Sequence, residues 1–309
     1  MRIYSLHGLA LASDLDLDAP LLPKSPLPDW TIVTGGCRTV GQDTPAGDLL
    51  AELRFKSGVG YAFVQIGSTY LFRFYGTCDF EVDMAARRAV AWIDPSSNPG
   101  IASLLASGTL ISSLLTFNGE CVLHASAVMH KNRGLAFIGR SGTGKTTLAT
   151  LCCRAGAALL TDDTLRVVWK GDAPWCFSGT HELRLRPGAS SLAQSAEFGQ
   201  DAVSPTIDKR TGIKLDLVPM DSALTALVIP HPSKTEKTLH LQRLQAPEAL
   251  LKLHSFLRVG GWKNRRIIKE QFKFLSQLAS TLPVYRATVP WGPPFADSLP
   301  KDILDCCIT

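Results

Sequence analysis

The sequence contains no apolar run long enough to cross a bilayer, so we expect neither a membrane protein nor a membrane partner. It also contains no internal repeat and no low-complexity segment, which argues against a solenoid or a disordered chain. The first residues, Met1 to Gly8, lack the apolar core of a signal peptide, and Asp14, Asp16 and Asp18 follow soon after. The expected compartment is therefore the cytoplasm.

Cysteine occurs eight times but never in C-x-x-C spacing. The vicinal pairs Cys152-Cys153 and Cys306-Cys307 are poorly placed to bridge internally, because a disulfide requires a larger separation of Cα atoms. We therefore expect reduced thiols that mostly fill the core. A charged fraction of 19% and an apolar fraction of 45% are typical of a globular protein. The net charge of +5 suits anionic ligands but does not by itself indicate nucleic acid.

What the sequence does contain is a complete phosphate-binding pattern, G-x-x-x-x-G-K-[ST], at Gly139–Thr146. Apolar residues 134–138 predict a strand before it, and the periodicity of residues 147–155 predicts a helix after it. Glycines let backbone amides turn toward anionic oxygens, and the helix N-terminus adds positive potential. Lys145 can reach the β- and γ-phosphates, and the Thr146 hydroxyl can ligate Mg²⁺. The residues predicted to bind nucleotide here are Gly139, Ser141, Gly142, Thr143, Gly144, Lys145, Thr146 and Thr147.

Two carboxylates, Asp162 and Asp163, end the next predicted strand, residues 157–163. One of them can hold the Mg²⁺ that bridges the phosphates, and the other can accept the proton of an attacking hydroxyl. The simpler alternative is a helix cap or turn at Asp163-Thr164. The pattern alone leaves the two catalytic roles exchangeable.

Three further features each have a structural alternative. His124 stands inside a predicted strand, residues 122–128, where a lone histidine is usually a satisfied core side chain. The segment 180–186 predicts a strand with alternating charged side chains, which could simply face solvent. The charged run Asp208-Lys209-Arg210 is typical of an exposed turn. The alternating charged residues are Glu182, Arg184 and Arg186.

Together these features resemble the catalytic domain of bacterial HPr kinase/phosphorylase. That family has a histidine on the strand before the loop, then the loop, an Asp-Asp pair and a Glu-x-Arg-Gly signature in the same order. The resemblance covers about Gly119 to Arg210 and implies an α/β (α+β) fold with a P-loop core like that of phosphoenolpyruvate carboxykinase. The catalytic residues it implies are Asp163, Asp162, His124, Lys145 and Arg184. From the chemistry of phosphoryl transfer we further predict Lys209 and Arg210 as ligands of the nucleotide, and Thr146, Asp162 and Glu182 as ligands of the metal.

The N-terminal pattern Y-x-x-x-G-L-x-x-x-S-x-L-x-L, from Tyr4 to Leu17, is similar to the opening of HPr-kinase-like proteins associated with lasso-peptide gene clusters. This second resemblance implies a kinase that uses ATP and Mg²⁺ to phosphorylate the C-terminal serine of a precursor peptide. Leu185 stands where the family signature has glycine, so we do not expect the reverse, phosphorylase reaction. The sequence does not fix the oligomeric state, and a homo-oligomer is compatible with it.

We predict two domains: a smaller β-rich domain over residues 1–97, and a P-loop catalytic domain over 98–309 with helices in the region 247–282. One alternative function is an HPr-type serine kinase that acts on a folded protein or a small molecule. A second alternative is an ATP-switched nucleic-acid-binding regulator, suggested only by the basic stretch 263–273.

Overall fold

The computed structural model describes residues 1–23, 26–55, 59–194, 197–215 and 221–308. The chain divides into two compact units, the first Met1–Gly119 with Val259–Glu270 and the second Glu120–Arg258 with Gln271–Thr309. Residues 98–119 and 259–270, which the predicted boundary at residue 97 assigns to the catalytic domain, group with the first unit.

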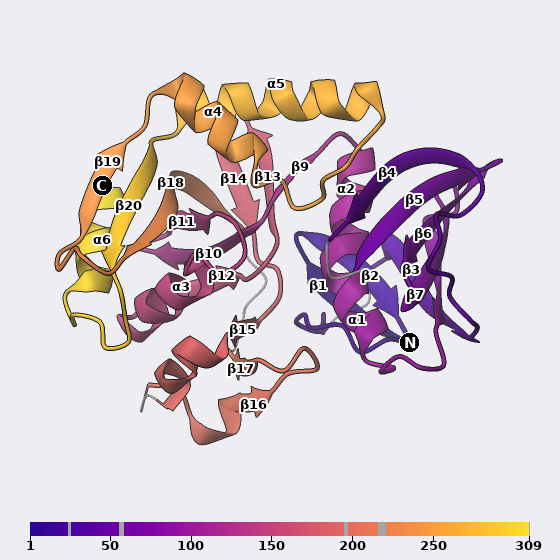
Figure 1. Ribbon diagram of the computed structural model, residues 1–309, viewed down its shortest axis with the longest axis horizontal. Helices are drawn as coiled ribbons and strands as arrows, with labels where there is room; N and C mark the ends of the chain where they lie inside the picture. Colours follow the sequence, from indigo (N-terminus) through magenta and orange to yellow (C-terminus); the bar gives the residue numbers. More distant parts are fainter. Residues whose placement is uncertain (24–25, 56–58, 195–196, 216–220, 309) are drawn as a thin grey trace. The chain divides into compact units, whose positions relative to one another are not determined.

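An eight-stranded sheet forms the centre of the first unit, in the order β1-β2-β3-β8-β7-β6-β5-β4 (Figure 1). The pairs β2–β3 and β3–β8 are parallel, and the other pairs are antiparallel. Phe63, Phe72 and Phe80 are fully buried, and the rings of Phe63 and Phe72 stack at 4.5 Å. The predicted β-rich character of this region is confirmed. The strands are β1 Arg2–Leu6, β2 Leu9–Ser13, β3 Trp30–Cys37, β4 Asp48–Arg54, β5 Gly60–Ile66, β6 Thr69–Phe74, β7 Cys78–Asp83 and β8 Arg88–Ile93.

A helical segment that changes its winding follows the turn at residues 94–100. It consists of α1 (Ile101–Leu105), a π-helical stretch η1 (Ala106–Leu110) and α2 (Ile111–Phe117). Ser112 donates to the carbonyl of Gly108 at 2.7 Å. Such bonds from serine hydroxyls compete with the backbone ladder, which is consistent with the irregular winding.

The second unit contains a nine-stranded sheet with the path β12-β10-β11-β18-β14-β13-β9; β20 pairs with β18, and β19 pairs with β20. The strands β11, β18 and β20 are parallel neighbours, so their carboxyl ends meet at one edge. In α/β sheets this edge is where ligands bind. The strands are β9 Cys121–Leu123, β10 Ala125–His130, β11 Arg133–Ile138, β12 Ala158–Thr161, β13 Leu165–Lys170, β14 Ala173–Phe177, β18 Asp221–Ser233, β19 His240–Arg243 and β20 Val284–Pro290.

Successive residues of β11 enter two different apolar clusters, as alternation along a strand requires. Phe137 belongs to the cluster that includes residues of α3 (Lys145–Arg154) and α6 (Leu299–Cys307). Ala136 and Ile138 belong to the cluster that includes residues of α4 (Ala246–His254) and α5 (Arg265–Thr281). The sheet of the second unit is thus covered by helices on both faces, and the predicted helices in region 247–282 are confirmed as α4 and α5.

A separate three-stranded sheet of the second unit has the order β15-β17-β16. Its strands are β15 Glu182–Leu185, β16 Val203–Pro205 and β17 Thr211–Lys214. The 3₁₀ segments η2 (Pro187–Gln194) and η3 (Gln200–Ala202) lie between β15 and β16 in the chain. This small sheet matters for function because β15 carries the predicted residues Glu182 and Arg184.

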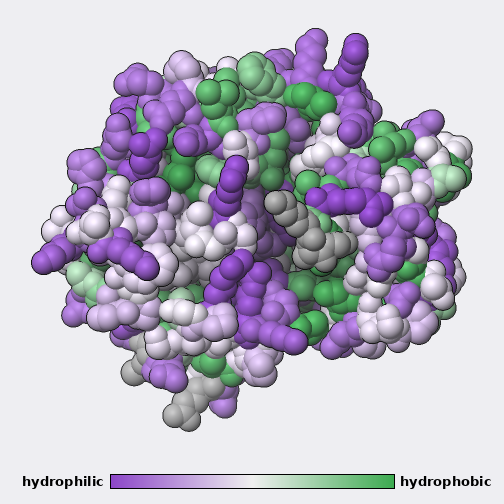
Figure 2. Space-filling view, in the orientation of Figure 1, coloured by the Kyte–Doolittle hydropathy of each residue, from purple (hydrophilic) through white to green (hydrophobic). Residues whose placement is uncertain are grey.

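Within the described ranges, none of the helices combines the length and the apolar character needed to span a bilayer. The basic stretch predicted from the sequence lies at the start of α5, where Arg265, Arg266, Lys269 and Lys273 are exposed. Phe272, with an exposed fraction of 53%, interrupts these cations. Figure 2 shows hydrophilic side chains beside apolar ones along the upper edge of the view, where Figure 1 places α5.

Candidate functional site

The glycine-rich loop connects the end of β11 to the start of α3, as the sequence predicted. Gly142 and Gly144 have φ values of +87° and +95°, in the region that side-chain-bearing residues rarely adopt. Gly144 immediately precedes the first helical residue, Lys145. The glycines are therefore required by the backbone path that turns the chain from strand to helix.

Lys145 lies at the N-terminus of α3 and is only 6% exposed. Its Nζ donates to the carbonyl oxygen of Arg140 within the loop, at 3.1 Å. Burial lowers the pKa of Lys145 to about 8, although the negative charges of Asp162 and Asp163 oppose this shift. A desolvated cation at a helix N-terminus is suited to an anionic ligand that replaces its lost hydration.

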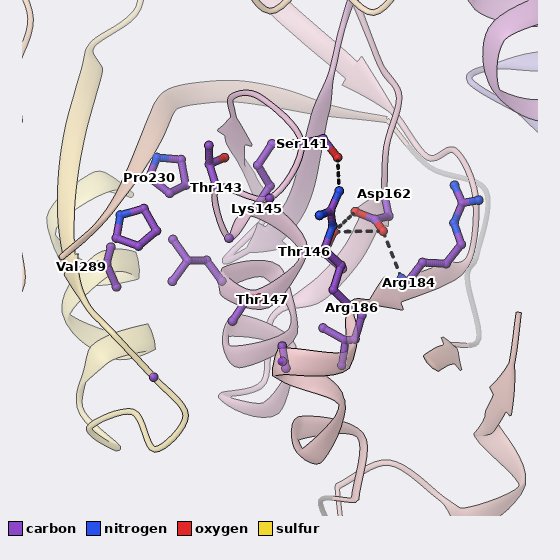
Figure 3. A pocket seen from close by; sticks show the side chains of 18 of the residues that line it. Ser141, Thr143, Lys145, Thr146, Thr147, Asp162, Arg184, Arg186, Pro230 and Val289 are labelled. Carbon is purple, nitrogen blue, oxygen red and sulfur yellow. Dashed lines mark hydrogen bonds between the residues drawn. The ribbon is translucent and has the colours of Figure 1, made fainter. Parts of the chain in front are cut away.

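Asp162 follows β12 and is held beside the loop by three donors. The hydroxyls of Thr146 and Ser126 donate to Oδ1 at 2.9 and 2.5 Å. The backbone N–H of Arg184 donates to Oδ2 at 3.1 Å. Asp162 is 2% exposed, so its carboxylate is fixed next to the Thr146 hydroxyl (Figure 3).

Asp163 has a positive φ of 71°, so its side chain turns away from the path of a regular strand. Its Oδ2 lies 2.7 Å from Nη2 of Arg258 and 3.7 Å from Nη2 of Arg184, and its Oδ1 lies 3.2 Å from Nδ1 of His124. Burial raises the pKa of Asp163, but Arg258, His124 and Arg184 outweigh burial and hold it well below its usual range. The carboxylate is therefore ionised and surrounded by positive or proton-donating groups.

The predicted continuous strand through residues 122–128 is wrong, because the strand breaks at His124. Before the break, β9 pairs with β13; after it, β10 pairs with β11 and β12. At the break, the N–H of His124 donates to the carbonyl of Phe256 at 2.8 Å, and Nδ1 lies 3.1 Å from the carbonyl oxygen of Asp163. The break aligns the imidazole with Asp163 instead of burying it in a sheet.

These groups share one cavity of about 320 Å³, which lies entirely in the second unit. Gly139, Glu182 and Lys209 are not among the described residues that line it. The carboxylate of Glu182 instead lies beside Gly212 of β17. The predicted site residues that do line the cavity are His124, Ser141, Gly142, Thr143, Gly144, Lys145, Thr146, Thr147, Asp162, Asp163, Arg184 and Arg210.

One wall of the cavity is apolar and comes from the carboxyl ends of β18 and β20. The register aligns Phe137 with Val228, so β18 continues past the point where β11 enters the loop. Figure 3 shows Pro230 and Val289 on the opposite side of the loop from Asp162 and Arg184. The apolar residues of this wall are Pro230, Pro232, Val289, Pro290, Trp291 and Phe295.

Three polar residues of the site were not predicted from the sequence: Ser126, Arg186 and Arg258. The signal for Ser126 in the sequence is its position two residues after His124, because alternation along a strand puts such residues on one face. Arg258 carries no local signal, because it reaches Asp163 from the segment after α4. Arg186 was noted only as part of a charged face, but its Nη2 donates to the Ser141 hydroxyl at 2.7 Å.

The oxygen donors at Thr146 and Asp162 fit a hard cation such as Mg²⁺. Among the residues described, no group of three or more His, Cys, Asp or Glu side chains could hold a metal ion. Mg²⁺ ordinarily takes one or two carboxylates and completes its shell with phosphate oxygens and water. The hydroxyl and carboxylate, 2.9 Å apart, therefore suffice on the protein side if a phosphate ligand is present.

No protein-family model and no curated protein matches the sequence. The solved structure of the Hpr(Ser) kinase/phosphatase from Coxiella burnetii is similar over 59% of this chain and 85% of that one. Its sequence identity to this chain is 12% and the TM-score is 0.30. At these values the similarity decides nothing about activity, and function has to be inferred from the site itself.

Proposed function

We propose that the chain binds Mg²⁺-ATP in this cavity and transfers the γ-phosphoryl group to a hydroxyl. The observation that carries the proposal is the meeting of three elements in one cavity: the phosphate loop with Lys145, the Thr146–Asp162 pair, and the ionised Asp163. A nucleotide-binding protein without transfer activity needs the first two elements. The third is the group that an acceptor hydroxyl requires.

The two walls of the cavity differ in polarity, and this difference indicates the orientation of the bound nucleotide. The apolar wall with Pro230, Val289 and the 61% exposed Trp291 suits a purine base, which can stack on an aromatic ring. The opposite side, with Asp162 and Arg184, is charged. We therefore place the base at the apolar wall and the terminal phosphate at the carboxylates.

In the proposed reaction the bond between the γ-phosphorus and its bridging oxygen breaks, and the acceptor oxygen forms the new bond to phosphorus. ADP leaves with the bridging oxygen, and the acceptor proton passes to Asp163. Arg258 and His124 hold the Asp163 carboxylate in place, and since they also lower its pKa, the proton passes late, as the new bond to phosphorus forms. Thr146 and Asp162 would hold Mg²⁺, which neutralises phosphate charge.

The acceptor is proposed to be a serine hydroxyl, in line with the resemblance of the site motifs to HPr-type kinases. The pattern from Tyr4 to Leu17 further favours the C-terminal serine of a lasso precursor peptide. A serine of a folded protein, or a small-molecule hydroxyl, would use the same cavity and the same groups. The three acceptor classes are distinguished by experiment.

The decisive measurement is mass spectrometry of candidate peptides, a folded carrier protein and small hydroxyl compounds after incubation with the protein, ATP and Mg²⁺. Phosphorylation is expected on one class, and Lys145→Ala should reduce it by about 10²–10³-fold, because a preorganised charge on the phosphates is lost. Lys131→Ala, an exposed lysine in the turn between β10 and β11, is the matched control and should have no effect. Unimpaired transfer by Lys145→Ala would show that the loop is not the phosphate site.

A further inference from the structure

Two arginines at the end of β15, Arg184 and Arg186, occupy contrasting environments. Arg184 lies within the strand, is 7% exposed, and has its Nη2 3.7 Å from the carboxylate of Asp163. Arg186 follows the last strand residue and is exposed. It lines the same cavity, yet the group it contacts is the neutral hydroxyl of Ser141 in the phosphate loop, at 2.7 Å.

The charge of Arg186 is not matched by a carboxylate of the residues that the structure describes. Across the described parts of the chain, no aspartate or glutamate forms an ion pair with Arg186, whereas Arg210 pairs with Asp208 at 3.0 Å. Arg186 shares the cavity with a second cation, Lys145, whose pKa is lowered first by burial and further by the charges of Arg258 and Arg186. Two like charges beside a glycine-rich loop are stabilised when an anion lies between them.

We propose that Arg186 is a catalytic arginine that leaves the Ser141 hydroxyl and binds the terminal phosphoryl group of ATP. The inference rests on the proposed nucleotide site and adds to it the residue that contacts the transferred group. Arg186 gives up only a neutral hydrogen bond when it moves, whereas Arg184 or Arg210 would have to leave a carboxylate. The planar fork of arginine is also suited to bind two phosphate oxygens at once.

The chemical role follows from the charge on the phosphoryl group during transfer. As the bond to the bridging oxygen breaks and the bond to the acceptor oxygen forms, negative charge is spread over the three other oxygens of the phosphoryl group. Arg186 would offset that charge without exchanging a proton, because a guanidinium stays protonated. Its position on the Asp162 side of the loop is the side on which the terminal phosphate is placed (Figure 3).

The experiment compares the affinities of Arg186→Ala for ATP and ADP in the presence of Mg²⁺, by titration calorimetry. Loss of a charged hydrogen bond to the terminal phosphate should weaken ATP binding by about 10- to 100-fold, and ADP binding by much less. Arg186→Gln can still hydrogen-bond Ser141 but lacks the charge, so it should behave like the alanine variant. Transfer to an identified acceptor should fall by about 10³-fold or more.

The control is Arg133→Ala, which removes an exposed arginine from the other end of β11 and should leave both affinities unchanged. Equal weakening of ATP and ADP, or no weakening of either in both Arg186 variants, would overturn the role of Arg186. Lys145→Ala tests the nucleotide site separately, since it should weaken both nucleotides. Normal binding of both by that variant would contradict the proposed function, whatever Arg186 does.

Discussion

Asp79 in the first unit and Asp163 in the second each lie beside two arginines, yet the two clusters differ in burial and in access to a cavity. Asp79 on β7 is opposite Arg73 on β6, which binds it through two nitrogens at 2.8 and 2.9 Å, and Arg38 lies 3.0 Å away. Its side chain is fully buried. The Asp163 side chain is 22% exposed, and it lines the cavity.

The two clusters differ in how their charges are paired: those around Asp79 are paired within the protein, whereas those around Asp163 include cations that can bind a ligand. Asp79 pairs with Arg73 across two strands, and Arg38 also pairs with Glu81 at 2.6 Å, so two carboxylates balance the two arginines and no charge remains for a ligand. At Asp163 the arginines come from separate segments, and the cluster stands beside Lys145 and Arg186, which have no carboxylate among the described residues in an ion pair with them. Cations without a carboxylate at ion-pair distance, one of them with a perturbed pKa, distinguish the site from the fully paired charges around Asp79.

The largest expected effect is on phosphoryl transfer when Asp163 loses its charge, which tests whether the charges of this cluster serve a ligand. Asp163→Asn keeps the shape of the side chain but removes the proton acceptor, so phosphoryl transfer should fall by about 10²–10⁴-fold. Nucleotide affinity should change far less, because Asp163 is not assigned to the phosphates. Steady-state kinetics with an identified acceptor, together with ATP titration, measures both quantities. A loss below tenfold would show that Asp163 is not the base.

The matched variant is Asp79→Asn, which tests the other half of the comparison. Removing the charge of Asp79 leaves the Arg73 guanidinium, 18% exposed, without its anionic partner. Breaking a buried pair on one side costs about 3–5 kcal/mol of unfolding free energy. Denaturant unfolding should show that loss, with per-molecule transfer by the folded fraction unchanged. Equal stability losses in the two variants would remove the contrast between the clusters.

A smaller effect is expected from the protonation of Lys145. Its folded-state pKa of about 8 lies below the ordinary value of 10.5, so between these pH values the unfolded chain binds more protons. The contribution of Lys145 to unfolding free energy should therefore increase as pH rises from 8 to 10.5. ATP affinity should change in the opposite direction, because the phosphates favour the charged amine, and its decline above this pKa approaches about tenfold per pH unit.

Lys145→Met isolates this dependence, since it removes the titrating amine while preserving an unbranched side chain. Denaturant unfolding and ATP titration across the same pH range would be compared between the two proteins. The difference between the pH profiles of the two proteins, rather than either profile alone, reports the titration of Lys145. Identical pH profiles would mean that another group titrates.

How far the sequence could predict this site depends on whether the determinants are local. The loop was predicted because its glycines, Lys145 and Thr146 are consecutive, and strand and helix signals flank them. The break at His124 was missed because it reflects which strands β9 and β10 pair with, and those partners lie far along the chain. Arg258 is brought to Asp163 by backbone pairing of its N–H with Val122, which no sequence pattern indicates.

The apolar wall was missed for the same reason. Pro230, Pro232 and Val289 share it only because β18 and β20 are parallel neighbours in a particular register. Each of these strands alone is an ordinary apolar run. By contrast, the β-rich character of the first unit was predictable, because short alternating runs between glycines favour strands wherever they pair.

The smallest expected effect concerns the apolar wall, which is the uncharged part of the site. Trp291→Ala should weaken ATP binding by about three- to tenfold, because one stacked ring contributes about 0.5–1.5 kcal/mol. Binding of inorganic tripolyphosphate, which has no base, should not change. Phe272→Ala, which removes an exposed aromatic ring from α5, is the control. If tripolyphosphate lost as much affinity as ATP, Trp291 would be acting on the shape of the phosphate site, and the base would have to lie elsewhere.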